Sequence, residues 1–323
     1  MEFDNKTIRI AVKLYLENET EGQEKYGHIN TWNVSNVTDM SWMFNSASSF
    51  NQQLNNWDVS NVTNMARMFE WASSFNQPLN KWNVSNVENM YGVFSHAKSF
   101  NQPLNKWNVG NVTYMDHMFY NATLFNQQLD TWDVGNVTNM EWMFCLTSSF
   151  NQPLNEWHVS NVTNMSFMFN IAASFNQPLN WWDVSNVTDM SGMFCGAESF
   201  NKSINNWDVR NVTDMCRMFQ NTGSFNQPLN EWDVSNVTNM SFMFQHTNIG
   251  LMLEKHNLSE KQFFVSPTNK KVYHELFDWS NKKDYVTFLV NNHYLPLNKH
   301  QEEHEYHPLF DNPDMSKHIA CYL

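Results

Sequence analysis

The chain of 323 residues places a tryptophan every 25 residues from Trp32 to Trp232, which gives nine copies of one unit. Columns of identical residues keep the same period, and those headed by Val34, Asn36 and Phe44 hold one residue type in all nine units. A catalytic site is needed once, whereas a unit that stacks on copies of itself repeats its contacts. The period therefore predicts a solenoid in which each unit packs against its neighbours.

The pattern inside one unit predicts its local structure. In the second unit, Trp57 and Val59 alternate around the polar Asp58, as in a short strand with one buried face. From Met65 to Ala72 the apolar residues are spaced three and four apart, which indicates one or two helical turns. We therefore expect an α/β repeat solenoid with one short parallel strand and one short helix in each 25-residue unit.

The two ends of the array predict helical caps, which a solenoid needs to cover its terminal apolar faces. Residues 6–20 have the spacing of an amphipathic helix. Its apolar face would carry Ile8, Ala11, Val12, Tyr15 and Leu16. The last 74 residues leave the repeat, with helices expected at 251–258, 271–279, 284–291 and 315–323. The expected organisation is a helical cap over 1–29, nine repeats over 30–249 and a helical C-terminal module over 250–323.

Charge and cysteine content limit the classes of partner and the cellular compartments that we expect. The net charge of -13 disfavours nucleic acid and anionic membranes as partners, and no stretch approaches a membrane span. The sequence as it stands begins without a secretory signal. Cys145 and Cys195 stand two units apart, about 10 Å, beyond disulfide reach, so we expect free thiols in a reducing compartment. A leader lost upstream would instead place the protein at a cell surface.

The unit FNQPLNEWDVSNVTNMSFMF at residues 225–244 resembles the BspA-like leucine-rich repeat, and the resemblance covers residues 30–249. Such repeats occur in bacterial surface lipoproteins and in large DNA viruses. The resemblance implies a right-handed, leucine-rich-repeat-like stack that recognises proteins and supplies no catalytic residues. Without a leader and with free thiols, the viral or intracellular branch is favoured, in the host cytoplasm or the virion. The alternative is an extracellular surface adhesin of the same fold.

The positions that differ between units are the candidate partner-binding surface. Trp142 stands where other units have Arg67 or Gly192, so we expect this column to be free of core packing. Tryptophan, tyrosine and arginine dominate the energy of protein interfaces, although a merely tolerant surface would vary too. We expect a monomer that binds a protein partner of unknown identity. The candidate residues are Trp42, Arg67, Trp71, Tyr91, His117, Tyr120, Trp142, Phe167, Arg217 and Phe242.

Three other patterns could each indicate metal binding or a purely structural role. His300, His304 and His307 could hold a metal on one helix face, or lie in a polar linker. The aspartates that follow many of the tryptophans, such as Asp58, could bind calcium or line a solvated face. The methionine columns could bind copper but suit a core better. Because no phosphate loop, nucleophile elbow or paired-cysteine motif occurs, we expect no enzyme, cofactor or metal; an enzyme built on the C-terminal histidines is a third alternative.

The asparagine column headed by Asn36 also has two interpretations. Each asparagine lies in an Asn-Val-Thr context except Asn86, so these residues are formal N-glycosylation acceptors. A buried ladder of side-chain amides that satisfies the backbone between two valine columns explains the column better, because it leaves no room for a glycan. We expect the buried ladder.

Overall fold

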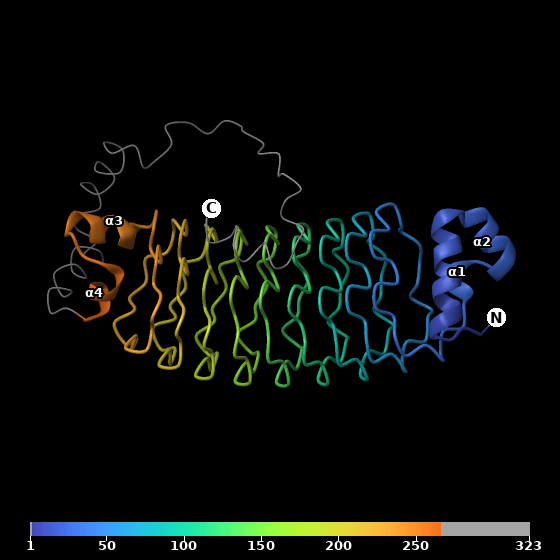
Figure 1. The fold of residues 1–323 in the computed structure, drawn as a ribbon, viewed down its shortest axis with the longest axis horizontal. Helices are drawn as coiled ribbons and strands as arrows, with labels where there is room; N and C mark the ends of the chain where they lie inside the picture. Colours follow the sequence, from blue (N-terminus) through green and yellow to red (C-terminus); the bar gives the residue numbers. More distant parts are fainter. Residues whose placement is uncertain (1, 266–323) are drawn as a thin grey trace, which may run out of the picture. The chain divides into compact units, whose positions relative to one another are not determined.

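A computed structural model of the chain describes residues 2–265, which belong to one compact unit. Helices α1 (Asn5–Glu17) and α2 (Glu19–Tyr26) and the 3-10 helix η1 (Ile29–Thr31) precede the repeats, and α3 (Asn248–Lys255) and α4 (Glu260–Val265) follow them (Figure 1). The helices expected at 271–279, 284–291 and 315–323 and the histidines His300, His304 and His307 lie outside the described residues.

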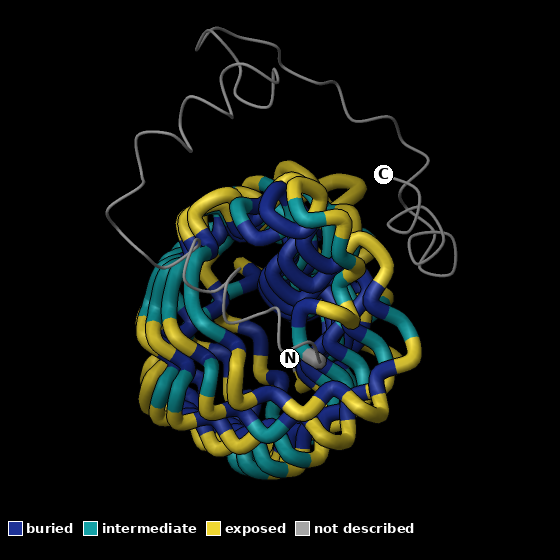
Figure 2. The backbone as a smooth tube through the Cα atoms, turned by 90° about the vertical axis from the view of Figure 1, so that its left-hand side faces the viewer, coloured by how far each residue is buried: buried dark blue, intermediate teal, exposed yellow. Residues whose placement is uncertain are grey.

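The repeats stack on one another in sequence order. Each repeat pairs with the next through a single-residue parallel bridge, such as Asn64 with Asn89, and the series runs without a gap from Asp39 to Asn239. Figure 2, which looks along the stack, shows the pattern of buried and exposed residues recurring from one repeat to the next. The chain is therefore a repeat protein.

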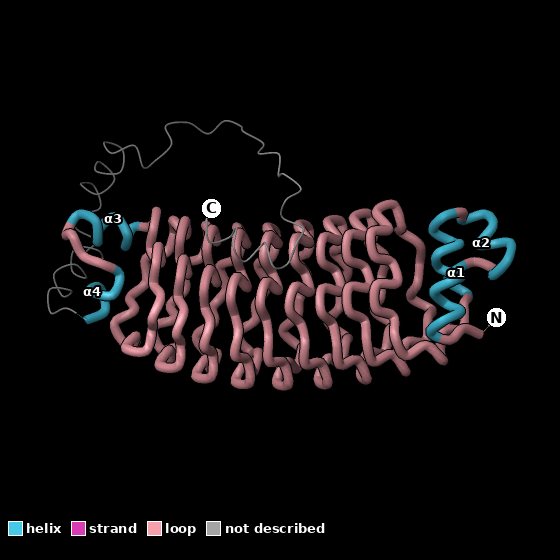
Figure 3. Tube along the Cα trace, in the orientation of Figure 1, coloured by secondary structure: helices cyan, strands magenta, loops and turns pink. Residues whose placement is uncertain are grey.

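The helix predicted in each unit is wrong, and Figure 3 shows only loops and turns between η1 and α3. In the second repeat a tight turn forms instead, because the Met68 N–H donates to the Met65 carbonyl at 3.1 Å and Arg67 has φ +56°. The turn at 69–72 repeats this geometry, with Trp71 at φ +62°. A positive φ at the third residue is the mark of a type II turn.

Hydrogen bonds between repeats explain why these turns replace a helix. The N–H groups of Met65 and Arg67 donate to the carbonyls of Asn89 and Tyr91 in the next repeat, at 3.0 and 2.7 Å. A helix would turn the same N–H groups back onto their own chain four residues earlier. The strand predicted at 57–59 is also wrong, since the bridges between repeats form in the segment that follows it.

The columns of identical residues form a continuous core. Trp132 is 3% exposed, lies parallel to Trp157 at 6.5 Å between ring centroids, and donates from Nε1 to the Leu104 carbonyl at 3.0 Å. Phenylalanines stack in the same way, as Phe144 does on Phe169 at 5.6 Å. Each apolar column therefore continues from one repeat into the next.

The spacing between neighbouring repeats differs from one side of the array to the other, and this difference curves the array. Backbone segments joined by hydrogen bonds lie about 4.8 Å apart, whereas the Phe144 and Phe169 rings are 5.6 Å apart and the Trp132 and Trp157 rings 6.5 Å. The repeats are thus closest along residues 39–46 and their equivalents and fan out toward the tryptophans, in agreement with the curve in Figure 1. We call the surface formed by residues 39–46 and their equivalents the inner face.

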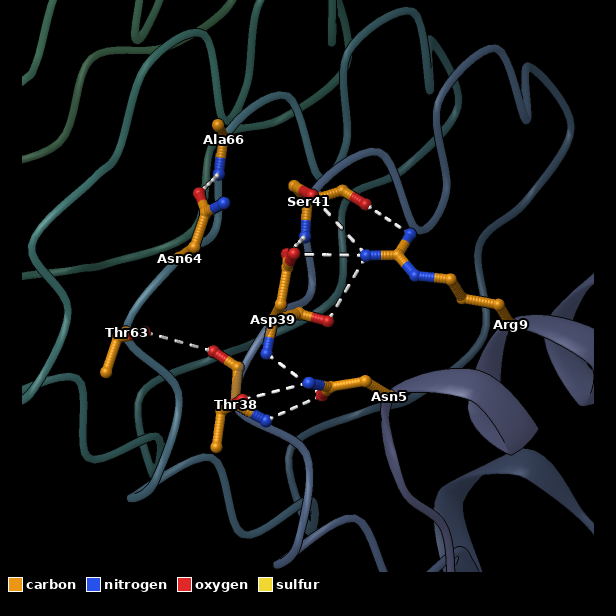
Figure 4. A network of polar contacts seen from close by, with 8 residues as sticks. All are labelled: Asn5, Arg9, Thr38, Asp39, Ser41, Thr63, Asn64 and Ala66. Carbon is orange, nitrogen blue, oxygen red and sulfur yellow. Dashed lines mark hydrogen bonds and ion pairs between the residues drawn. The ribbon is translucent and has the colours of Figure 1, made fainter.

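Helix α1 replaces the repeat that is missing before the first one (Figure 4). The Asn5 side-chain carbonyl accepts from the N–H groups of Thr38 and Asp39 at 2.8 and 3.1 Å, and Arg9 donates to the carbonyl of Ser41 at 2.7 Å. The predicted cap is confirmed for Ile8, Ala11, Val12 and Tyr15, which are buried. It is wrong for Leu16, which is 40% exposed.

At the other end, α3 and α4 cover the apolar interior of the ninth repeat. The Phe264 ring stacks on Trp232 at 6.3 Å, and the Phe263 ring meets Phe244 edge-on. Helix α3 begins three residues earlier than predicted, because the Thr247 side chain accepts from the Gly250 N–H at 3.0 Å and caps the helix there.

The asparagine side chains do bond to the backbone as predicted, but the prediction that they are buried is wrong. Asn136 is exposed, and its Nδ2 donates to the Gly110 carbonyl of the preceding repeat at 2.6 Å. The flanking valines, Val134 and Val137, take the buried positions instead. The column therefore joins repeats along an exposed surface.

Replacing Asn136 with alanine should lower the free energy of unfolding by about 0.5 to 1.5 kcal/mol, because water can reach the carbonyl that loses its partner. Urea denaturation followed by tryptophan fluorescence measures the change. Thr138→Ala is the matched control, since Thr138 is exposed on the same segment and its side chain donates no hydrogen bond to any described residue. A loss above about 3 kcal/mol would mean that the carbonyl is inaccessible to water.

Candidate protein-binding surface

The inner face carries two left-handed backbone positions in every repeat. They are the columns headed by Trp42 and Ser46, where φ runs from +54° to +69°. Glycine suits this conformation best, and another residue costs about 1 to 2 kcal/mol there. Only Gly92, Gly192 and Gly196 are glycines in the two columns. Contacts of the other side chains must therefore offset an unfavourable backbone.

Arg67 makes the central contact of the first three repeats. Its guanidinium lies between the rings of Trp42 and Tyr91, at 4.6 and 4.7 Å from their centroids. It also donates to the Tyr91 hydroxyl at 2.7 Å and pairs with the Glu70 carboxylate at 3.3 Å. Both faces of the guanidinium and both of its terminal nitrogens therefore contact other residues of the protein.

The stack continues through the next three repeats. Tyr91 meets His117 at 5.4 Å, His117 stacks on Trp142 at 6.0 Å, and Trp142 stacks on Phe167 at 4.4 Å. Six of the ten candidate residues thus form one row, which we call the aromatic row: Trp42, Arg67, Tyr91, His117, Trp142 and Phe167. Arg217 and Phe242 form a separate pair at 5.5 Å.

The glycines on the inner face are covered by large side chains of the preceding repeat. A Cβ on Gly192 would lie 2.4 Å from a ring carbon of Phe167, and one on Gly196 would lie 3.1 Å from the Ile171 side chain. A Cβ on Gly92 would lie 3.3 Å from Arg67. At these three positions a large side chain in one repeat therefore occupies the space that a side chain of the next repeat would need.

A second group joins the aromatic row from the column of Trp71. Trp71 stacks on His96 at 3.6 Å, His96 meets Tyr120 edge-on at 4.8 Å, and Tyr120 meets Trp142 edge-on at 5.8 Å. His96 was missing from the candidates predicted from the sequence. Its place 25 residues after Trp71, in the same varied column, was the signal that could have identified it.

Burial shifts the protonation equilibria of this surface. It lowers the pKa of His96 to about 3, helped by the positive charge of Lys98, so the ring is neutral at neutral pH. It raises the pKa of Glu70, although the nearby Arg67 opposes the shift, and it raises the pKa of the Tyr91 hydroxyl. His96 therefore contacts its neighbours as a neutral aromatic ring.

The candidate residues differ in how much of each side chain solvent can reach. Trp42 and Phe242 are 50% and 49% exposed, whereas Trp142, Phe167 and Arg217 are buried at 5 to 6%. The expectation that this column is free of core packing is thus wrong for Trp142, because the rings of the adjacent repeats cover it. Trp42 also lines a hollow of about 350 Å³ with Met43 and residues of α1.

The structure also places the other candidates for chemistry. Burial raises the pKa of the Cys145 thiol, and that of Cys195 to about 11; both are free thiols. Asp58 accepts from the Ser60 hydroxyl at 2.6 Å and from its N–H at 3.1 Å. Within residues 2–265, no group of three histidine, cysteine or acidic residues could hold a metal ion. No helix in that part is long and apolar enough to cross a membrane.

Comparison with known proteins identifies a repeat family. The family model described as "Mycoplasma protein of unknown function, DUF285" matches three successive segments, residues 15–123, 103–186 and 178–264. Together they cover residues 15–264, which include all nine repeats. No curated protein and no solved structure matches the chain.

Proposed function

The chain belongs to the family described as Mycoplasma protein of unknown function, DUF285, and from that premise we propose that its repeat array recognises a protein partner through the inner face, without enzymatic activity. The proposal takes Trp42 and the hollow beside it as the accessible end of the binding surface. The buried members of the aromatic row then act as a rigid support beneath it. The protein works as a monomer in this proposal.

One observation carries the proposal. The backbone of the column headed by Trp42 is left-handed in all nine repeats, yet seven repeats hold tryptophan, arginine, histidine or phenylalanine there. The left-handed backbone does not require these types, and tryptophan and arginine are among those that dominate binding energy at protein interfaces. A concave surface that fixes such side chains in advance also reduces the ordering that binding requires.

We extend the proposal to the type of repeat and to the cellular compartment. The array is a right-handed solenoid of the BspA-like leucine-rich-repeat type, as the motif FNQPLNEWDVSNVTNMSFMF suggests. The free thiols of Cys145 and Cys195 favour a reducing compartment, such as the host cytoplasm or a giant-virus particle. A surface adhesin of the same fold is the second candidate. Immunolocalisation in the native host separates the two.

Trp42→Ala should weaken binding of the partner at least five-fold while leaving the melting temperature nearly unchanged, because the ring is half exposed and lines a hollow. The full-length chain is immobilised, partners are captured from the native host, and the purified partner is then titrated by calorimetry against each variant. Trp181→Ala is the matched control, since Trp181 is 66% exposed and lies outside the inner face. Equal affinity of both variants would place recognition elsewhere.

A further inference from the structure

The first side chain of the aromatic row is covered on one face only. The Arg67 guanidinium lies 4.6 Å from the centroid of the Trp42 ring, on the side of the second repeat. Trp142, in the same column, is covered on both faces, by His117 at 6.0 Å and by Phe167 at 4.4 Å. The exposed fractions agree, at 50% for Trp42 and 5% for Trp142. The place that corresponds to His117 is therefore unfilled beside Trp42.

Helix α1 takes over the backbone contacts of the missing repeat but does not fill this place. Its side chains bond to the backbone of residues 38–41 (Figure 4). The hollow of about 350 Å³ remains between the helix and the first repeat, and its apolar walls are Val12, Leu16, Trp42 and Met43. Met43 is 6% exposed, whereas its equivalents are 0 or 1% exposed. An apolar cavity of about 150 Å³ is large enough to bind benzene, so an aromatic ring fits here.

The walls of the hollow favour a flat apolar occupant. Leu16 lies on the apolar side of α1 and is still 40% exposed, and the Trp42 ring beside the hollow is half exposed. Covering both side chains removes apolar surface from water. The inner face also shows what stacks on its tryptophans, since the His96 ring lies 3.6 Å from Trp71 between centroids. An aromatic ring therefore matches the hollow in both size and chemistry.

Two polar groups beside the hollow favour a carboxylate next to that ring. The Trp142 indole N–H donates to the Glu141 carboxylate at 3.1 Å, whereas the corresponding N–H of Trp42 has no acceptor among residues 2–265. The Lys13 side chain lines the hollow and is 75% exposed, and its ion pair with Glu17 is long, at 3.8 Å. A carboxylate placed here gains a hydrogen bond and an opposite charge.

We propose that the hollow binds an aromatic side chain of the partner protein, and that an adjacent acidic residue of the partner accepts from Trp42 Nε1 and pairs with Lys13. The inference rests on the proposed function, since it gives the chemistry of the partner at the accessible end of the same surface. A guanidinium would also stack on Trp42, as Arg67 does. It is disfavoured because two of the three charged residues that line the hollow, Arg9 and Lys13, are cations.

The dipeptide acetyl-Glu-Phe-amide tests the proposal on the full-length chain. The 14 tryptophans are replaced biosynthetically by 5-fluorotryptophan, and the fluorine resonance of Trp42 is identified by its loss in Trp42→Phe. The dipeptide should shift this resonance saturably, with a dissociation constant on the order of millimolar, and leave that of Trp181 unchanged. Acetyl-Glu-Leu-amide and acetyl-Gln-Phe-amide should each bind about three-fold more weakly or worse, since one lacks the ring and the other the charge.

Two variants of α1 test the same contacts from the side of the protein. Leu16→Phe places a ring in the hollow and should weaken binding of both the dipeptide and the captured partner about five-fold or more. Ile10→Phe is the matched control, because Ile10 is 53% exposed on the same helix and does not line the hollow. Lys13→Glu should weaken binding about three-fold or more, whereas Lys6→Glu, on an exposed residue away from the hollow, should not.

The inference and the proposed function fail in different ways. An unshifted Trp42 resonance up to tens of millimolar dipeptide, or equal binding of the leucine dipeptide, overturns the inference. A captured partner that loses affinity for Trp42→Ala but not for Leu16→Phe also overturns it, and leaves recognition through the inner face in place. Saturable dipeptide binding with an unchanged affinity of the partner for Trp42→Ala supports the chemistry of the hollow and overturns the proposed function.

Discussion

Trp132→Ala should lower the free energy of unfolding by about 3 to 5 kcal/mol. The side chain is 3% exposed and stacks on Trp157, so its removal leaves a cavity inside the array. It also leaves the Leu104 carbonyl without the indole donor that now lies 3.0 Å away. Urea denaturation followed by circular dichroism measures the loss.

Trp181→Ala is the matched control for this substitution. Trp181 is 66% exposed, so its removal should change stability by no more than about 0.5 kcal/mol. Equal losses for the two variants would contradict a core built on the tryptophan column. Since each repeat contacts only its neighbours, a broadened transition is also expected for Trp132→Ala.

Gly192→Ala should cost about 2 to 4 kcal/mol of stability, a large effect for a single methyl group. The residue has φ +58°, and its new Cβ would lie 2.4 Å from a ring carbon of Phe167. Thermal and urea denaturation of the purified variant measure the change. Gly223→Ala is the control, because a Cβ on Gly223 meets no atom within 4 Å.

The cause of that loss can be separated by a double-mutant cycle. Phe167→Ala alone removes ring contacts and should destabilise the protein, but combined with Gly192→Ala it also removes the collision. The two effects should therefore be non-additive, with the double variant more stable than the sum predicts by about 1 to 3 kcal/mol. Additive losses would show that the Phe167 ring is not what excludes a side chain at residue 192.

The sequence predicted the stack but not its local geometry. Nine equivalent tryptophans with their valine, methionine and phenylalanine columns require repeated contacts, and these columns are buried as expected. The spacing of three and four from Met65 to Ala72 is typical of a helix, but here it arises from consecutive turns. The deciding hydrogen bonds join residues 24 positions apart, and local propensity carries no information about them. The left-handed positions at Arg67 and Trp71 were also not predictable, because glycine, the usual sign of such a backbone, is absent there.

The candidate site was predicted in part. Variation between units pointed to the columns that form the aromatic row, and rings from Trp42 to Phe167 do lie in contact. The burial of Trp142 was not predictable, because it depends on which residues precede and follow it one repeat away. His96 was missed for a related reason, since its importance comes from stacking on Trp71.

The pairing of a large side chain with a glycine in the following repeat has a genetic consequence. Unequal recombination between units could delete 25 residues and keep the period, for example by removing the repeat that contains Gly192. Phe167 would then face Arg217 in place of a glycine, so its ring would have to leave the position that it now takes over Gly192. A library of recombined arrays should therefore keep the repeat that carries Phe167 together with the repeat that carries Gly192.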